Sequence, residues 1–319
     1  MQSSLGFIGG NTTMNILVTG GAGFIGSNLV RKLLTSGRRV RVLDNLSTGH
    51  RPYVVSAEVE FFAVDVRDRR LPDEMLSGVD VVVHLAGQTN VQRSLEMPRE
   101  DFQINVEGTL NLLEASVKHG VKKFIFASSN AAVGQVTLPI HEEALPKPLS
   151  PYGSSKLACE GYCMAFHHSY GLETAALRFA NAYGPFSSHK TSVVARFFRE
   201  GIEKGVLTIY GDGLQTRDFV YVDDVCEAIL ACIDRDDLRG EVFQIGSGRE
   251  TRILDLAEKV KGLLHPSPTV RFLPARKAEI VRNVSGIEKA KRRLGFQPKT
   301  SLDKGLGRTC RWFLDGSDH

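Results

Sequence analysis

The sequence predicts an α/β fold with a doubly wound parallel sheet and a second, smaller C-terminal α/β lobe. Short apolar runs alternate with amphipathic stretches through the first half of the chain, a pattern that builds parallel sheets covered by helices on both faces. A glycine-rich turn follows the first apolar run directly, as in folds that bind dinucleotides. The 319 residues suffice for one large domain or two small ones.

The elements of the predicted sheet follow in order along the chain. Each strand is a short apolar run, and apolar residues recur at helical spacing in the stretches between the runs. The strands are expected at Asn15–Thr19, Val40–Leu43, Glu60–Val64, Val79–Leu85, Lys123–Ala127 and Thr174–Arg178, and helices at Phe24–Ser36, Asp101–His119 and Tyr152–Tyr170.

The rhythm of the chain loosens after Pro185, where shorter elements are separated by prolines. A strand at Glu241–Gly246 and a helix at Ile253–Leu264 have the pattern of a unit that rejoins the large sheet, so the small lobe is expected to be partly discontinuous. The predicted division is a flexible leader at 1–13, a cofactor-binding domain at 14–185 joined by 241–264, and a substrate-binding lobe at 186–240 and 265–319.

Composition excludes several classes of protein. No apolar run approaches the roughly 20 residues of a membrane span, and residues 1–13 lack the features of a secretory signal, so a cytoplasmic protein is expected. The net charge of +4 gives no argument for nucleic acid. The five cysteines form no CxxC pair and have no clustered histidines, so we expect reduced thiols and no metal site.

Glycines in the stretch VTGGAGFIGS predict the cofactor site. Gly20, Gly23 and Gly26 lie after the first strand and at the start of the first helix, where they permit a tight turn and close approach of backbone amides to a pyrophosphate. Asp44 ends the second strand, at the distance where an acid binds the adenosine ribose hydroxyls, and its carboxylate favours NAD over NADP. Glycine-rich turns and capping aspartates also occur without a cofactor, but together these residues indicate a Rossmann-type dinucleotide site.

Tyr152 and Lys156 predict the chemistry. They are four residues apart at the start of a long helix, so their side chains share one face. An ammonium and an oxidised nicotinamide beside a phenol would lower its pKa toward neutrality and make it a general base. Ser128 and Ser129 follow an apolar strand and lie at the carboxyl edge of the sheet, where ligands bind. The alternative is an ordinary helix contact beside a serine-rich turn.

These residues belong to a longer series of motifs that resembles the extended short-chain dehydrogenase/reductases, the NAD-dependent epimerase/dehydratase family that includes the UDP-glucose 4-epimerases. The resemblance covers nearly everything from Met14 to the end of the chain. Its motifs are GGAGFIGSNL, DNLSTG, DVRD, HLAGQTNV, NVEGT, ASSNAAVG, SPYGSSK, LRFANAYGP, IYGDGLQTRDFVYVDDV and LGFQP.

The resemblance implies catalysis by Ser129, Tyr152 and Lys156. Tyr152 would remove the proton of the sugar 4-hydroxyl while hydride passes to NAD, and the 4-keto sugar would turn over and take the hydride back. By the same resemblance, the cofactor residues would be Gly20, Gly23, Phe24, Ile25, Gly26, Asp44, Asn45, Ser47, Thr48, Gly49, Asp65, Val66, Leu85, Ala86, Gly87, Gln88, Asn105, Tyr152, Lys156 and Phe179.

The resemblance also implies a UDP-sugar substrate and a homodimer formed by the two long helices. Arginine suits the diphosphate because its planar fork pairs two phosphate oxygens. The matching substrate residues are Ser129, Asn181, Val193, Thr208, Ile209, Tyr210, Arg217, Arg276 and Glu279.

Departures from the family pattern leave the exact reaction open. Val133 replaces a frequent tyrosine, and Asn130 stands at a usually small position. Dehydratases and decarboxylating relatives need an acid just after the catalytic hydroxyl, which Asn130 and Ala131 cannot supply, so 4-epimerisation of a neutral, N-acetylated or acidic UDP-sugar is favoured. His189 and Lys190 offer positive charge for a sugar carboxylate. A nucleotide-sugar reductase or dehydrogenase and a non-catalytic NAD-binding scaffold are the alternatives.

Overall fold

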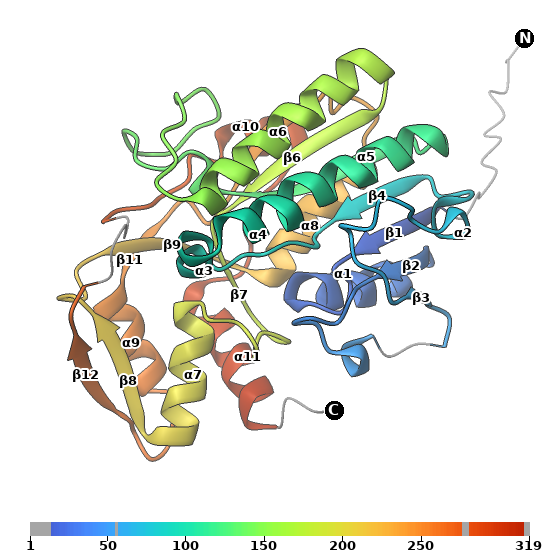
Figure 1. Ribbon diagram of the computed structural model, residues 1–319. Coiled ribbons are helices and arrows are strands. Elements are labelled where there is room, and N and C mark those ends of the chain that lie inside the picture. The colour runs from blue at the N-terminus through green and yellow to red at the C-terminus, as the bar shows by residue number, and fades with distance from the viewer. Residues whose placement is uncertain (1–13, 55–56, 276–280, 316–319) are drawn as a thin grey trace, which may run out of the picture.

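The computed structural model describes residues 14–54, 57–275 and 281–315, and Figure 1 shows their arrangement. Seven strands form one parallel sheet in the order β10-β6-β5-β4-β1-β2-β3. This arrangement confirms the predicted fold class. The strands are β1 (Asn15–Thr19), β2 (Arg39–Leu43), β3 (Glu60–Phe62), β4 (Val81–His84), β5 (Lys123–Ser129), β6 (Glu173–Phe179) and β10 (Glu241–Ile245).

The strand order reverses direction between β1 and β4. The chain winds outward from β1 through β2 to β3, then returns to the other side of β1 and continues outward from β4. In open parallel sheets the crevice at such a reversal, beyond the carboxyl ends of the strands, is where ligands bind. The fold therefore positions a ligand site beyond Thr19 and His84, at the ends of these two strands.

Helices cover both faces of this sheet. On one face, α1 (Phe24–Thr35) and α8 (Val222–Ile233) pack against each other and bury Leu29, Leu33 and Ile229. The other face is covered by α2 (Asp73–Leu76), α5 (Gly108–Lys118) and α6 (Pro151–Tyr170), and α5 and α6 lie side by side in Figure 1. Each face has its own apolar core.

The helix predicted at 101–119 is assembled from three pieces. Helix α4 (Pro98–Phe102) leads into the π-helical segment η2 (Gln103–Glu107), which leads into α5, and the short helix α3 (Val91–Glu96) precedes them. Helix α6 has clear end signals, because Ser150 caps its first turn by accepting a hydrogen bond from the Gly153 N–H, and Gly171 ends it with φ +70°. Short 3₁₀ turns lie at Arg51–Tyr53 (η1) and Asn130–Ala132 (η3).

The second lobe holds two small sheets and their helices, seen at the lower left of Figure 1. Helices α7, α9 and α11 contact one another, and α7 and α9 also pack on β8. The two sheets have the orders β11-β9-β7 and β12-β8. The bounds are β7 (Asn181–Tyr183), α7 (Val193–Lys204), β8 (Val206–Tyr210), β9 (Thr216–Tyr221), β11 (Glu250–Arg252), α9 (Ile253–Lys261), β12 (Thr269–Leu273), α10 (Glu288–Leu294) and α11 (Leu302–Leu314).

The elements are distributed between the two parts differently from the predicted division, in which 241–264 rejoins the domain at 14–185. Strand β10 adds to the edge of the large sheet beside β6, whereas α9, from the same predicted unit, packs on α7 and β8 in the small lobe. Helix α8, from the segment assigned to the small lobe, covers the large sheet, and α10 packs on β10 and α8. Covering the apolar face of the large sheet takes elements from both halves of the chain.

A buried ion pair connects α6 to strand β6 of the large sheet. Glu160 accepts hydrogen bonds from Arg178 Nε at 2.8 Å and Nη2 at 2.7 Å, and the Ser128 hydroxyl also donates to Glu160. Glu160 and Arg178 are 5% and 3% exposed. All five cysteines are buried and free, and within the described ranges no helix combines the length and apolar character that a membrane crossing needs.

Candidate active site

The glycine-rich turn joins β1 to the amino end of α1 in the crevice of the large sheet. Gly20 has φ +68°, a conformation that favours glycine, and a Cβ on Gly26 would lie 2.1 Å from the Gly20 carbonyl oxygen. Helix α1 has no acidic residue in its first turn and no side-chain cap. The N–H groups at Phe24 and Ile25 therefore begin a helix whose positive end suits a pyrophosphate.

Asp44 lies at the end of β2, beside this turn. Its carboxylate accepts hydrogen bonds from the Ala22 N–H at 3.0 Å and the Leu46 N–H at 2.8 Å, and burial raises its pKa. A Cβ on Gly49 would come within 2.9 Å of an Asp44 oxygen, so glycine leaves room for that carboxylate. The other residues predicted on this loop, Asn45, Ser47 and Thr48, are exposed.

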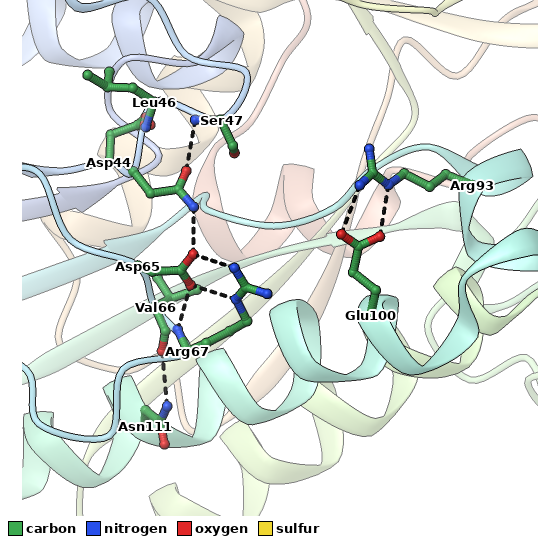
Figure 2. A network of polar contacts seen from close by, with 10 residues as sticks. Asp44, Leu46, Ser47, Asp65, Val66, Arg67, Arg93, Glu100 and Asn111 are labelled. Atoms are coloured by element: carbon green, nitrogen blue, oxygen red, sulfur yellow. Dashed lines mark hydrogen bonds and ion pairs between the residues drawn. The ribbon is translucent and has the colours of Figure 1, made fainter.

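The residues expected to flank adenine form a polar network (Figure 2). Asn45 donates to Asp65 at 2.7 Å, and Arg67 forms an ion pair with the same carboxylate at 2.8 Å. This ion pair holds the pKa of Asp65 well below its usual range. Asn111 donates to the Val66 carbonyl at 3.0 Å, which fixes the backbone where the adenine is expected.

The segment after β4 forms the next part of the same edge. Asn105 is 1% exposed, and its Nδ2 donates to the Gln88 carbonyl at 3.1 Å. Its Oδ1 is buried without a hydrogen-bond partner among the described residues, which leaves an acceptor for a ligand. A Cβ on Gly87 would lie 2.7 Å from that oxygen and 3.5 Å from Lys156 Nζ, so glycine keeps the approach open. Leu85 and Ala86 complete this segment.

These features fit the NAD predicted from the sequence. The glycine turn at 20–26 is shaped for close approach, Asp44 lies where the ribose is expected, and Gly87 lies beside Lys156 and the Asn105 oxygen that has no partner among the described residues. The carboxylate of Asp44 disfavours a cofactor with a 2′-phosphate because two anions would meet there.

The predicted catalytic residues come together at the carboxyl end of β5. Ser129 is close enough to the Tyr152 phenol to lower its pKa through a hydrogen bond, and Lys156 Nζ lies 6.0 Å from the centre of the Tyr152 ring. Lys156 Nζ also donates to the Ala127 carbonyl at 2.9 Å. Tyr152 is 8% exposed and Lys156 is 4% exposed, so the phenol and the ammonium act in a desolvated site.

In the protein alone, desolvation dominates the pKa of the Tyr152 phenol. Burial raises the pKa of Tyr152 to about 12, and the hydrogen bond from Ser129 lowers it only in part. Burial likewise lowers the pKa of Lys156. Desolvation disfavours the charged form of both groups, and the prediction that Lys156 and an oxidised nicotinamide together lower the pKa of the phenol stays a prediction. A further positive charge beside the phenol is required to make it a base near neutrality.

Asp101 is a buried carboxylate behind this site that the sequence analysis did not single out. It is 1% exposed and accepts from Ser155 Oγ at 2.6 Å, Gln88 Nε2 at 2.8 Å and Asn105 Nδ2 at 3.1 Å. It therefore links α6, which carries the predicted catalytic pair, to Gln88 and Asn105, two residues of the predicted cofactor site. No local pattern marks it, because the Ser155 contact joins positions 54 residues apart.

A cavity of about 350 Å³ lies against the catalytic residues, between the large sheet and the small lobe. Its volume is in the range of small-molecule sites. No aspartate or glutamate of the described chain lines it. The lining residues are Thr89, Asn90, Val91, Gln92, Ser129, Asn130, Ala131, Gly134, Leu149, Ser150, Tyr152, Phe179, Ala180, Asn181, Lys190, Thr191, Ser192, Val193, Arg217 and Asn283.

Asn130 and the predicted substrate residues differ in how they meet this cavity. Asn181, Val193 and Arg217 line it, as does Phe179 from the predicted cofactor set. Asn130 is held by Nδ2 hydrogen bonds to Asn283 Oδ1 at 3.0 Å and Ser285 Oγ at 2.9 Å.

The structure does not bring strand β8 to this cavity. Thr208 and Ile209 are 2% and 0% exposed, and the Thr208 backbone bonds to Glu200 and Arg196 of α7. The prediction that these two residues border uracil stays a prediction, and their buried side chains leave only the backbone for such a contact. Tyr210 is half-buried with Arg196 over its ring, and Arg276 and Glu279 lie outside the described residues.

His189 and Lys190 differ in a way that the sequence does not reveal. Lys190 lines the cavity, whereas His189 does not. Burial, with Lys190 as the next cause, lowers the pKa of His189 to about 4, so its imidazole is neutral at pH 7. The expectation of positive charge from His189 is therefore wrong, and Lys190 alone supplies it.

Comparison with known proteins agrees with this geometry. Residues 16–246 match the NAD dependent epimerase/dehydratase family. The chain is 32% identical to UDP-glucuronate 4-epimerase from Thermodesulfobacterium geofontis, over 93% of this chain and 95% of that one. It is 39% identical to the structure of UDP-glucose 4-epimerase with UDP-glucose from Thermotoga maritima, with a TM-score of 0.89 and coverage of 95% and 99%.

A dehydratase is similar to the chain as well. The structure of dTDP-glucose 4,6-dehydratase from Streptomyces venezuelae with NAD bound has a TM-score of 0.87 and 33% identity, covering 95% of this chain and 98% of that one. Similarity alone therefore leaves the reaction type open between epimerisation and dehydration.

Proposed function

Because the chain belongs to the NAD dependent epimerase/dehydratase family, we propose that it is a UDP-sugar 4-epimerase that uses NAD. The observation that carries this proposal is the make-up of the cavity. It holds the Ser129 and Tyr152 hydroxyls, but no described aspartate or glutamate lines it. Removing a proton from a carbon beside the keto group, as dehydration requires, needs a further base there, and Asn130 is neutral.

The residues of the chain divide the work of the reaction. The turn at 20–26 and Asp44 hold the cofactor, and Lys156 holds its nicotinamide ribose beside the phenol. When bound, oxidised NAD supplies the hydride acceptor at sugar carbon 4 and the added positive charge that lowers the pKa of Tyr152. Tyr152 takes the proton of the 4-hydroxyl, which leaves a 4-keto sugar, and later returns that proton to the oxygen. Ser129 donates a hydrogen bond to the same oxygen.

The low exposure of the site supports this division. A phenol that is 8% exposed exchanges its proton with the substrate in preference to bulk water, so the proton removed in the first step remains for the last. Over a full turnover, the reaction then neither consumes nor releases a hydride or a proton. Net reduced cofactor does not accumulate, which separates an epimerase from a dehydrogenase.

We also propose a homodimer formed through the outer faces of α4 to α6. These helices carry exposed apolar side chains, among them Phe102 at 48% and Tyr162 at 38%. Exposed aromatic side chains favour a protein interface.

Product analysis with the purified protein tests the enzymatic proposal. UDP-glucose, UDP-N-acetylglucosamine and UDP-glucuronate are incubated separately, and the products are resolved by chromatography. We expect a 4-epimer from at least one sugar without a net absorbance change at 340 nm. A 4-keto-6-deoxy product would assign a dehydratase, and a steady rise at 340 nm would assign a dehydrogenase.

A matched pair of variants tests the assigned base. Tyr152→Phe removes the phenolic hydroxyl and is expected to lower kcat by about 10²- to 10⁴-fold, the usual contribution of general acid–base catalysis. Tyr170→Phe makes the same change at the exposed end of the same helix and should retain activity. Equal activity of wild type and Tyr152→Phe would remove Tyr152 from the mechanism.

A further inference from the structure

Lys190 enters the cavity from the segment between β7 and α7. Its Nζ donates a hydrogen bond to Thr89 Oγ1 at 2.7 Å, so the side chain spans from the small lobe to the segment that follows β4. This contact joins residues 101 positions apart and holds the ammonium against the cavity wall at Thr89, the residue after Gln88. Thr89 and Lys190 both line the cavity that holds Tyr152.

The ammonium of Lys190 has no acidic partner within the described part of the chain. The described cavity lining contains no carboxylate, and its other charged side chain is Arg217. Burial and the nearby charge of Lys156 lower the pKa of Lys190 to about 8, so it is still mostly protonated at pH 7. A partly buried cation without a counter-charge is costly to maintain, and an anionic group on the ligand would offset that cost.

The position of Lys190 distinguishes the sugar from the diphosphate. Lys190 Nζ is held by Thr89, in the segment that follows β4 of the large sheet, so the ammonium lies on the large-sheet side of the cavity that Tyr152 also lines. Arg217 enters from β9 in the small lobe. In a hexopyranose, carbon 6 is bonded to carbon 5, which is the neighbour of the reacting carbon 4. The diphosphate is attached to carbon 1, on the opposite side of the ring from carbon 4. A cation near the catalytic residues is therefore better placed for carbon 6 than for the diphosphate.

We propose that Lys190 binds the carbon 6 carboxylate of a UDP-hexuronate and makes an acidic sugar the preferred substrate. This inference rests on the proposed UDP-sugar 4-epimerase function and names its substrate class. The ammonium donates to the carboxylate while Thr89 holds the side chain in place. With His189 neutral, Lys190 supplies the charge for this recognition.

The test compares kcat/KM for UDP-glucuronate and UDP-glucose in wild type, Lys190→Met and Lys190→Arg. Wild type should prefer UDP-glucuronate. In Lys190→Met that preference should fall by about 10- to 100-fold, the worth of one hydrogen bond to a charged group. Lys190→Arg should recover part of it. Lys204→Met, which removes a lysine from the exposed end of α7, should leave the preference at the wild-type value.

Other roles for the ammonium give different results. An equal loss for both sugars would assign Lys190 to the diphosphate, and a loss of NAD from the purified Lys190→Met protein, measured after denaturation, would assign it to the cofactor. A wild-type preference for UDP-glucose would also overturn the inference.

Binding separates this inference from the proposed reaction. If no sugar is epimerised, the proposed function fails, but calorimetric binding of UDP-glucuronate and UDP-glucose still tests Lys190. Tighter binding of the acid that is lost in Lys190→Met would support it, and equal binding of the two ligands would overturn it.

Discussion

Removing the Glu160 carboxylate is expected to destabilise the protein strongly, because Arg178 would remain buried without its counter-charge. The pair is 5% and 3% exposed, and it makes two hydrogen bonds of 2.8 and 2.7 Å. Arg178 Nη1 already lacks a hydrogen-bond partner among the described residues, so the guanidinium has no spare contact to compensate. Breaking such a buried pair costs about 3–5 kcal/mol.

The loss in Glu160→Ala can be converted into a shift of the melting temperature. At about 2.1 cal/mol/K per residue, the 319 residues give an unfolding entropy of about 0.67 kcal/mol/K. A loss of 3–5 kcal/mol then corresponds to a fall in Tm of about 4–8 °C. Calorimetry gives the Tm directly, and urea unfolding monitored by circular dichroism gives the change in midpoint.

Two further variants separate the charge from the packing. A double variant that combines Glu160→Met and Arg178→Met leaves no unpaired buried charge. It should therefore be clearly more stable than Glu160→Ala. Glu227→Ala breaks an ion pair with Lys32 at the surface and should have a much smaller effect. A loss below about 1 kcal/mol in Glu160→Ala, or a double variant no better than the single one, would refute the reasoning.

Two other properties can be checked. Burial lowers the pKa of His84 from 6.5 to about 3, so the unfolded chain binds a proton at this histidine more readily than the folded protein does. The free energy of unfolding should therefore fall as pH decreases from about 6.5 toward 3, and it should fall less steeply in His84→Asn. Urea unfolding at a series of pH values measures both slopes, and identical slopes would contradict this prediction. Phe102→Glu adds a charge to the proposed dimer face and should convert the dimer to a monomer, as measured by light scattering after size-exclusion chromatography. The control variant Glu203→Gln on α7 should remain a dimer. An unchanged dimer in Phe102→Glu would exclude Phe102 from the interface.

Local patterns in the sequence were enough to predict the large sheet and the glycine turn. Strand β1 occupies the predicted residues, and the other six predicted strands of this sheet differ by one or two residues at their ends. The π-helical segment Gln103–Glu107 was not predicted, because its periodicity differs little from that of the surrounding helix. Strands and helices with a strong apolar periodicity are the elements most easily predicted from sequence.

Long-range packing explains what the sequence could not predict in the site. The contact between Asn130 and Asn283 joins residues 153 positions apart, and no spacing rule connects them. Ile209 lies in a motif typical of the family, yet its side chain is fully buried. The direction of the Tyr152 pKa shift depends on desolvation by the whole fold, which spacing along one helix does not report.

The cavity walls at 89–92 and 190–193 come from connecting segments and the first turns of the helices that follow them, whereas the residues assigned to NAD and to proton transfer lie on or next to the large sheet. Sequence change in these two segments can thus redirect the enzyme toward another sugar while the redox apparatus stays intact. In laboratory evolution, a library confined to those positions, with the helix-capping Asn90 kept, would sample new substrates while leaving the core unchanged.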